Sequence, residues 1–333
     1  MREITLARAL GEAIREEMIR DDTVFIIGVE VGLYGGCFRV TEGLFDEFGA
    51  ERVIDTPISE SALVGAAAGA AVMGMKPVAE VMYQDFATLV MDQILNGAAK
   101  LRYVHAGQAT VPMVLRAPFG ASGAGAHHSQ SIEAMFCHIP GVKVVIPSTP
   151  YDAKGLLKSA IRDPNPVLFF EHKLTYGIKD EIPDEDYTVS LGKADIKLQG
   201  KDLTIVTWGL MVHKALNAAA ELAKKGIELE VIDLRTLVPL DTATIVSSVK
   251  KTSRLMIVHE ACKTGGYGSE ITDIVTREAF GYLDSPVHRV ATPDTTIPFS
   301  RPLLEAIIPD EKDIVAVALS MTGNRITEVE NGI

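Results

Sequence analysis

The chain has 333 residues, of which 47% are hydrophobic and 23% charged, and its formal net charge is −12 at pH 7. This composition is typical of a soluble globular protein with about two domains. The acidic balance argues against a nucleic-acid partner, because nucleic acids select basic surfaces. No apolar run is long enough to predict a membrane span, and the first residues show no signal-peptide pattern.

The cysteines are few and odd in number, and they lack the spacing of metal ligands. They are Cys37, Cys137 and Cys262. Unpaired thiols of this kind are typical of a reducing compartment, so we expect a cytoplasmic protein.

Short apolar strands alternate with helices through the first half of the chain. The pattern predicts strands at 24–28, 53–54, 77–82, 111–116, 142–146 and 167–170, and helices at 6–19, 61–74, 86–103 and 153–161. This alternation indicates a parallel sheet covered on both faces, and ligands of such sheets gather at the carboxyl ends of the strands. Glu30, Glu60, Met82 and the glycine-rich segment after Arg116 all lie at predicted strand ends.

A charged segment at 179–186, which contains Pro183, reads as a linker. A second alternating unit follows, with strands predicted at 203–207, 229–233 and 254–258 and helices at 211–225, 241–250 and 269–279. We therefore predict two α/β domains, at 1–185 and 186–333.

Glu60 stands where a polar turn meets a helix made almost wholly of small residues. A helix this poor in bulky side chains allows a flat ligand or another backbone to approach closely. A carboxyl group held against it would lose water, which favours its protonated form. The alternative is local: Ser59 caps the helix and Glu60 complements its dipole in the first turn.

Several familiar motifs are absent. The chain has no G-x-x-x-x-G-K-[ST] and no G-x-S-x-G, so it signals neither a P-loop nucleotide hydrolase nor an esterase. His127 and His128 lie in the glycine-rich segment 120–130. Adjacent histidines point in different directions and make a poor metal site. A histidine presented to a ligand and one bonded to its own loop remain equally compatible with this segment.

Taken together, these residues resemble a known family. The strings Gly32-Leu-Tyr-Gly-Gly36, Asp55-Thr-Pro-Ile-Ser-Glu60, His128-Ser-Gln130, Pro150-Tyr-Asp-Ala-Lys-Gly155 and Ser159-Ala-Ile-Arg-Asp163 occur in this order. They resemble the β subunit of the thiamine-diphosphate-dependent first component of 2-oxo acid dehydrogenase complexes. The resemblance runs from about Ile4 to Leu319. It implies a pyrimidine-type parallel-sheet domain that binds thiamine diphosphate, followed by a transketolase-type C-terminal α/β domain.

The resemblance also implies roles for single residues. Glu60 matches the glutamate that hydrogen-bonds a ring nitrogen of the cofactor's aminopyrimidine, and Glu30 matches an acid near it. The residues that match the lining of the ring are Ile58, Met82 and Phe86. His128 matches a histidine that acts in reductive acyl transfer to lipoyl.

A structural potassium site is implied as well. Its matching residues are Met113, Ala160, Ile161, Asp163 and Asn165. Hard cations prefer oxygen ligands of this kind, although a simple turn also explains Asp163-Pro-Asn-Pro166.

One expected motif is missing. The diphosphate-binding signature of this cofactor class begins with Gly-Asp-Gly, and that string occurs nowhere in the chain. The chain therefore resembles half of an active site, whose other half, with magnesium and diphosphate, comes from an α subunit. The resemblance implies an assembly of two α and two β chains that docks on a lipoyl acyltransferase core.

The substrate remains open between pyruvate, a branched-chain 2-oxo acid and acetoin. Two rival classes are a single-chain enzyme resembling transketolase or deoxyxylulose-phosphate synthase, and a non-catalytic binding relative. The missing Gly-Asp-Gly argues against the first, and the joint presence of Glu60, Phe86 and His128 argues against the second.

Overall fold

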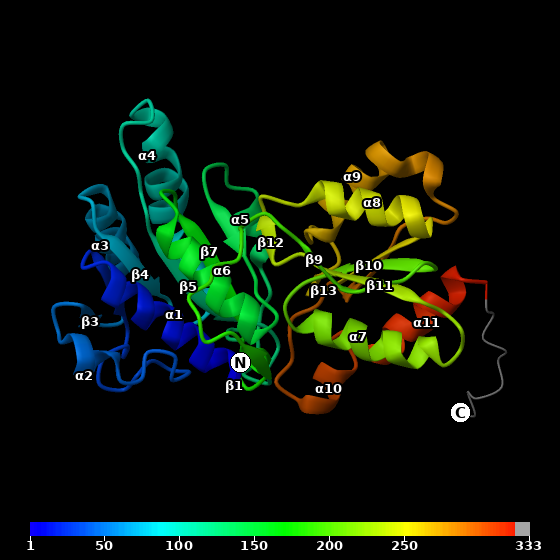
Figure 1. Cartoon of the computed structure of the whole chain (residues 1–333), viewed down its shortest axis with the longest axis horizontal. Helices are drawn as coiled ribbons and strands as arrows, with labels where there is room; N and C mark the ends of the chain where they lie inside the picture. The colour runs from blue at the N-terminus through cyan, green and yellow to red at the C-terminus, as the bar shows by residue number, and fades with distance from the viewer. Residues whose placement is uncertain (324–333) are drawn as a thin grey trace. The chain divides into compact units, whose positions relative to one another are not determined.

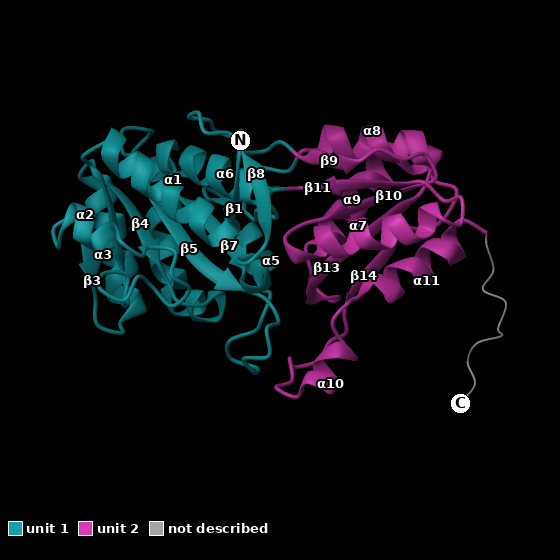
Figure 2. Cartoon of the chain, turned by 60° about the horizontal axis from the view of Figure 1, so that its bottom comes forward, with its two compact units in different colours: residues 1–193, 235–240 teal, residues 194–234, 241–333 magenta. Residues whose placement is uncertain are grey.

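The computed structural model describes residues 1–323 of the chain. It contains two compact units (Figure 2). Unit 1 comprises residues 1–193 and 235–240, and unit 2 comprises residues 194–234 and those from 241 on. The segment Arg235–Leu240 thus joins unit 1, an exchange that a single boundary at 185 does not anticipate. The domain division at 1–185 and 186–333 stays a prediction, and its last ten residues lie outside the described part.

Unit 1 is built on a seven-stranded sheet whose strand order is β12-β6-β7-β5-β4-β2-β3. All neighbours are parallel except β12, which is antiparallel to β6. The strands are β2 (Val24–Gly28), β3 (Val53–Asp55), β4 (Lys76–Glu80), β5 (Val114–Phe119), β6 (Lys143–Val145), β7 (Val167–His172) and β12 (Thr236–Val238). The strands β2, β5 and β7 are wholly buried, which explains their continuous apolar runs.

Helices cover both faces of this sheet (Figure 1). α1 (Leu6–Arg20) and α6 (Pro150–Arg162) pack together on one face. Each begins at a threonine whose hydroxyl accepts a backbone amide bond, Thr5 for α1 and Thr149 for α6. The other face carries α3 (Glu60–Val72), η1 (Gln84–Val90) and α5 (Glu133–Cys137). The remaining elements of unit 1 are β1 (Arg2–Thr5), α2 (Leu44–Phe48), η2 (Gln93–Ala98), α4 (Ala99–Val104), η3 (Lys173–Thr175) and β8 (Lys179–Ile182).

Three predicted elements of unit 1 were wrong in detail. The helix predicted at 86–103 is a 3-10 helix, a π-helix and a short α-helix in succession, an irregularity that a period of 3.6 residues does not reveal. The strand predicted at 111–116 begins only at Val114, because Pro112 has no amide hydrogen for the ladder. Half of the predicted linker, Lys179–Ile182, is a strand antiparallel to β1. Charged residues are typical of such edge strands.

Unit 2 has its own sheet and its own core. Five strands stand in the order β14-β13-β10-β11-β9, parallel except for β9. The strands are β9 (Asp195–Leu198), β10 (Leu203–Thr207), β11 (Leu229–Asp233), β13 (Leu255–Cys262) and β14 (His288–Thr292). The helices are α7 (Leu210–Ala223), α8 (Thr242–Thr252), α9 (Gly268–Ala279), η4 (Phe280–Tyr282), α10 (Arg301–Glu305) and α11 (Glu311–Met321). The predicted α/β class is therefore confirmed for both units.

Unit 2 buries a histidine at the end of its central strands. The ring of His259 stacks on that of Trp208, with centroids 5.4 Å apart and planes inclined by 10°. Its Nδ1 lies 3.1 Å from the carbonyl oxygen of Ala261, and its Nε2 has no hydrogen-bond partner in the described chain. Gly268 permits this packing, because an added Cβ would lie 2.8 Å from Nε2. Burial lowers the pKa of His259 to about 4.

This buried imidazole predicts a loss of stability in acid. Because the pKa is about 4 when folded against an ordinary 6.5, its contribution is complete above pH 6.5 and is lost as the pH falls towards 4. Replacing His259 by Gln should remove this part of the slope, which for one proton is at most about 1.4 kcal/mol per pH unit. Urea unfolding followed through Trp208, the one tryptophan of the chain, measures it. Identical slopes for both proteins between pH 6.5 and 4 would contradict the assignment.

Candidate functional site

The predicted site residues follow neighbouring strands of the unit 1 sheet. Glu30 comes shortly after β2, Glu60 after β3, Phe86 after β4 and His128 after β5. The ends of β2, β3 and β4 are in register, since Gly28 stands opposite both Asp55 and Glu80. The chain places β3 on one side of β2 and β4 on the other. Such a reversal of strand order is where open α/β sheets bind their ligands.

The loop after β2 is held in place at several points. Glu30 adopts a positive φ of 59° and is exposed, while its carbonyl accepts the amide of Gly36 at 2.8 Å. The amide of Gly32 donates to Asp55 Oδ1 at 2.7 Å, and the hydroxyl of Thr41 donates to the carbonyl of Val31 at 2.7 Å. These bonds fix the main chain beside Glu30.

Glu60 is the first residue of α3 and is half-buried. The hydroxyl of the next residue, Ser61, donates to the carbonyl of Leu89 at 2.7 Å, which ties the start of α3 to the end of η1. Ser59 makes no capping hydrogen bond with its side chain, so the expected cap was wrong, whereas Glu60 does lie in the first turn of the helix. Ile58 points to solvent, with 76% of its surface exposed.

The small residues of α3 do not all face the core. Ala62, Ala66 and Gly69 are exposed, and the surface continues through Met73, 84% exposed, just after the helix. Leu89 at the end of η1 is also 57% exposed. This apolar surface on the outer side of the helix, which we call the α3 face, is of the kind that another chain covers.

An aromatic group lies beyond the ends of β4 and β5. The ring of Phe86 and the imidazole of His128 lie edge to face, 5.3 Å apart between centroids. Tyr83 contacts both rings, at 5.6 Å from Phe86 and 4.7 Å from His128. The structure thus brings two of the predicted site residues together. Met82, Phe86 and His128 are each half-buried, so their apolar surfaces remain partly accessible to a flat ring.

Sequence reasoning missed three consecutive residues at the end of β7. Lys173 is 8% exposed; its ammonium donates to the carbonyl of His128 and stands over the Tyr83 ring, 5.1 Å from its centroid. His172 is buried against Gly120, where an added Cβ would lie 2.1 Å from its Nε2. Glu171 is fully buried. The signal was present: three polar residues directly follow the apolar run 167–170, at the strand end where ligands gather.

Glu171 belongs to a buried ion cluster that joins three strands. Arg116 of β5 is fully buried and donates to Glu80 of β4 at 2.5 Å and to Glu171 of β7 at 2.7 Å. The Tyr176 hydroxyl donates to Glu171 at 3.4 Å. Burial raises the pKa of Glu171 to about 7, against the opposing charge of Arg116. Gly36 lies against Glu80, so the cluster also supports the loop that carries Glu30.

The residues of the predicted potassium site lie where α6 ends. Met113, Ala160 and Ile161 are buried there. The side chains of the other two residues have protein partners. The Asp163 carboxylate pairs with the ammonium of Lys143 and accepts the amide of Asn165 at 2.9 Å, and Asn165 Oδ1 accepts a bond from Arg102 at 2.6 Å. The main-chain oxygens of Met113 and Ala160 also accept amides, from Val167 at 2.9 Å and Asp163 at 3.2 Å, so a cation here would need their second lone pairs.

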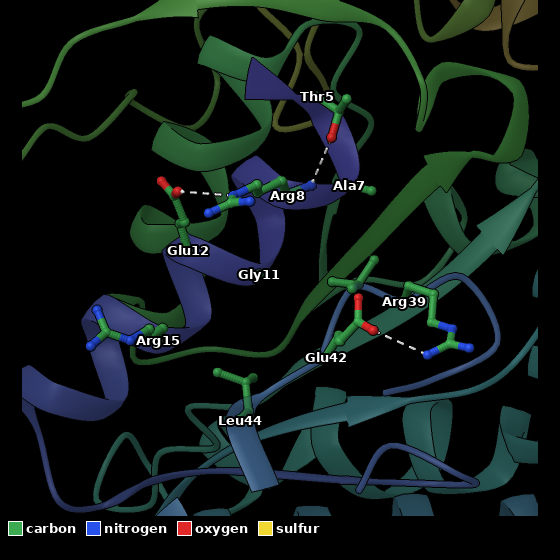
Figure 3. A pocket seen from close by; sticks show the side chains of 10 residues that line it. Thr5, Ala7, Arg8, Gly11, Glu12, Arg15, Arg39, Glu42 and Leu44 are labelled. Atoms are coloured by element: carbon green, nitrogen blue, oxygen red, sulfur yellow. Dashed lines mark hydrogen bonds and ion pairs between the residues drawn. The ribbon is translucent and has the colours of Figure 1, made fainter. Parts of the chain in front are cut away.

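A separate cavity of about 490 Å³ lies between α1 and the segment leading into α2 (Figure 3). None of the predicted site residues lines it. Its arginines face carboxylates: Arg8 lies 3.7 Å from Glu12, and Arg39 lies 3.1 Å from Glu42. With these charges balanced within the chain, the cavity indicates no particular ligand.

In the described part of the chain, the site has groups that suit a flat ring but not groups that suit a metal ion. A half-buried carboxyl group, an aromatic wall and a nearby imidazole fit a flat heteroaromatic ring with basic nitrogens. By contrast, the described residues include no cluster of three or more carboxylate, histidine or cysteine side chains that could hold a metal ion. No helix within them is long and apolar enough to cross a membrane.

The fold and the strand-end site define a transketolase-type protein. Residues 2–179 match the transketolase pyrimidine-binding domain, and residues 192–314 match the transketolase C-terminal domain. A solved split-gene transketolase, described as an inactive β4 tetramer, superposes with a TM-score of 0.79 at 25% identity. The superposition covers 96% of this chain and 98% of that one.

Sequence relatives narrow the class. The chain is 48% identical to the β subunit of an acetoin:2,6-dichlorophenolindophenol oxidoreductase of Cupriavidus necator, over 95% of this chain and 97% of the relative. It is 47% identical to two β subunits of Bacillus subtilis, those of 2-oxoisovalerate dehydrogenase (93% and 96% covered) and of the pyruvate dehydrogenase E1 component (96% and 98% covered). The chain therefore belongs to the family of the β subunits of 2-oxo acid and acetoin dehydrogenases, which confirms the resemblance drawn from its motifs.

The ion cluster supports a prediction about stability. Replacing Arg116 by Met leaves two buried carboxylates without their cation, which should cost about 3–5 kcal/mol of unfolding free energy. Urea unfolding of the purified chain measures the loss. Lys201→Met is the matched control, because its pair with Glu228 is exposed and should change stability by less than about 1 kcal/mol. Similar losses in both variants would show that the cluster does not hold the strands together.

Proposed function

We propose that this chain is the β subunit of the first component of a 2-oxo acid dehydrogenase complex, which oxidatively decarboxylates a 2-oxo acid and transfers the acyl group to lipoyl. One observation carries the proposal: the strand ends of unit 1 present Glu60, Phe86 and His128 at one edge of the sheet, in a family of such β subunits. Pyruvate and branched-chain 2-oxo acids are the proposed substrates. Acetoin is the alternative, because the relatives with these three activities are almost equally similar.

The residues have distinct proposed tasks. Thiamine diphosphate supplies the carbanion chemistry that cleaves the bond next to the carbonyl, which no side chain can do alone. Glu60 holds a proton at a ring nitrogen of the aminopyrimidine, with Glu30 as the nearby acid of the same edge. Met82 and Phe86 form the apolar wall of the ring, and Ile58 contributes main-chain contact. His128 acts when the acyl group passes to lipoyl.

The second half of the site is assigned to an α subunit. This chain has no Gly-Asp-Gly string, so the diphosphate and its magnesium need ligands from another chain. The exposed α3 face belongs to the helix that begins at Glu60 and is the surface we assign to subunit contact. Two α and two β chains, docked on a lipoyl acyltransferase core, complete the proposal.

The proposal has two further parts, a potassium site and a location. Potassium at the end of α6 depends on main-chain oxygens of Met113, Ala160 and Ile161, since the side chains of Asp163 and Asn165 already have partners. A cytoplasmic location fits the three free cysteines, which are all half-buried and unpaired.

Cofactor binding should depend on the partner chain. Because the diphosphate and magnesium ligands are missing here, calorimetry should detect no tight binding of thiamine diphosphate with magnesium to the purified chain, and micromolar or tighter binding after the α chain is added. Micromolar affinity of the chain alone would overturn the shared site. Parallel assays of the pair with pyruvate, 2-oxoisovalerate and acetoin, with a dye as the electron acceptor, select the substrate.

Glu60→Gln separates proton transfer from packing. Gln has nearly the same shape but cannot exchange a proton, so turnover of the assembled enzyme should fall about 100-fold or more. Unfolding free energy should change by no more than about 1 kcal/mol, because the charge of Glu60 contributes to stability only through the helix dipole. Dye-coupled decarboxylation and urea unfolding measure the two effects. The control is Glu51→Gln at an exposed position. Near-normal turnover of the Glu60 variant would refute the role given to this residue.

A further inference from the structure

The loop that carries His128 is rich in glycine and has little intrinsic rigidity. Three of its glycines, Gly120, Gly123 and Gly125, have positive φ angles of 96°, 80° and 80°. Glycine loses more conformational freedom on ordering than any other residue. A histidine that must meet a reacting group from such a loop therefore depends on anchors from neighbouring elements.

Two anchors flank Ser129. On one side, Asp85 Oδ1 accepts the amide of Gln130 at 3.2 Å and its side-chain nitrogen at 2.8 Å. On the other side, the ammonium of Lys173 donates to the carbonyl of His128. Asp85 comes from η1 and Lys173 from η3, so the loop is tied to the ends of both β4 and β7.

Lys173 also contacts the ring on which the imidazole rests. Its Nζ lies 5.1 Å from the centroid of Tyr83, and that ring lies edge to face with His128 at 4.7 Å. One buried cation thus fixes the main chain of His128 through a charge-assisted hydrogen bond and the neighbouring ring through a cation–π contact. The cation–π contact needs a positive charge at the end of a long side chain, and the same charge strengthens the hydrogen bond.

We propose that Lys173 is a positioning residue for acyl transfer, which fixes the glycine-rich loop so that the His128 imidazole stays against Tyr83 and Phe86. The inference rests on the proposed function, but it concerns a residue that acts through another. It predicts that loss of the Lys173 charge loosens this one loop and impairs the step assigned to His128, while decarboxylation itself is largely retained.

The test uses the enzyme reconstituted with its α chain and compares Lys173→Met with Lys173→Arg. The first readout is hydrogen exchange of the peptide spanning 120–130, measured without cofactor. Met should raise its exchange rate about tenfold or more, as loss of a hydrogen bond to a charged group implies, and Arg should restore most of the protection. Lys154→Met is the control: this lysine is also buried but pairs with Glu12 and Glu16, away from the loop, and should leave loop exchange unchanged.

The second readout is the ratio of two activities. Lys173→Met should lower acyl transfer to lipoyl about tenfold or more and dye-coupled decarboxylation less than about threefold, with His128→Ala as the reference for a pure transfer defect. A merely structural role predicts equal losses in both assays and no rescue by Arg. Unchanged loop exchange, or equal losses, would overturn the proposal.

The two proposals can fail separately. An unmodified enzyme without decarboxylase activity refutes the proposed function, whereas loop exchange still decides whether Lys173 fixes the loop. Should Lys173→Met fail to assemble, Lys173→Gln takes its place. Gln keeps a donor but not the charge, and the same outcomes decide.

Discussion

The buried ion pairs of Arg116 are the interactions on which the candidate site depends. Its bonds to Glu80 and Glu171 link the ends of β4, β5 and β7, and each of these strands leads directly into a part of the site. β4 leads to Tyr83 and Phe86, β5 to the His128 loop, and β7 to Lys173. Buried charges are costly unless they are paired and hydrogen-bonded, so this cluster tolerates little displacement of any of the three strands. The distances between the segments that follow these three strands are therefore fixed as well.

The same part of unit 1 exposes apolar side chains to solvent. Ile58 is exposed just before α3, and the α3 face carries small and apolar side chains at the surface of the helix that begins with Glu60. In a complete enzyme such a surface would be a liability for aggregation. In a subunit that contributes half of a site it is the surface that a partner closes.

The sequence predicted the sheet and the position of the site better than it predicted contacts. Apolar runs and strand ends were enough to place Glu30, Glu60, Met82 and the glycine-rich segment after Arg116 at one edge, because parallel strands share an edge whatever their order. Phe86 and the choice of His128 came from the family resemblance. The strand order itself, and the pairing of Tyr83 with His128, depend on contacts between residues far apart in the chain. Lys179–Ile182 was read as a linker because its charges suit an edge strand as well as a loop. Lys173 was missed because a lysine after a strand is usually solvated, and only the structure shows its burial.

The two anchors of the His128 loop explain how a glycine-rich segment can serve a defined chemical step. Glycine lets the main chain approach His172 closely, since any Cβ at Gly120 would overlap that ring, but it leaves the loop without intrinsic rigidity. Asp85 and Lys173 supply opposite charges to the amide of Gln130 and the carbonyl of His128. The main chain on either side of Ser129 is thus held by two charged side chains, one at an amide hydrogen and one at a carbonyl oxygen. Rigidity comes from the surrounding strands and close approach from the glycines, and a histidine at this position needs both.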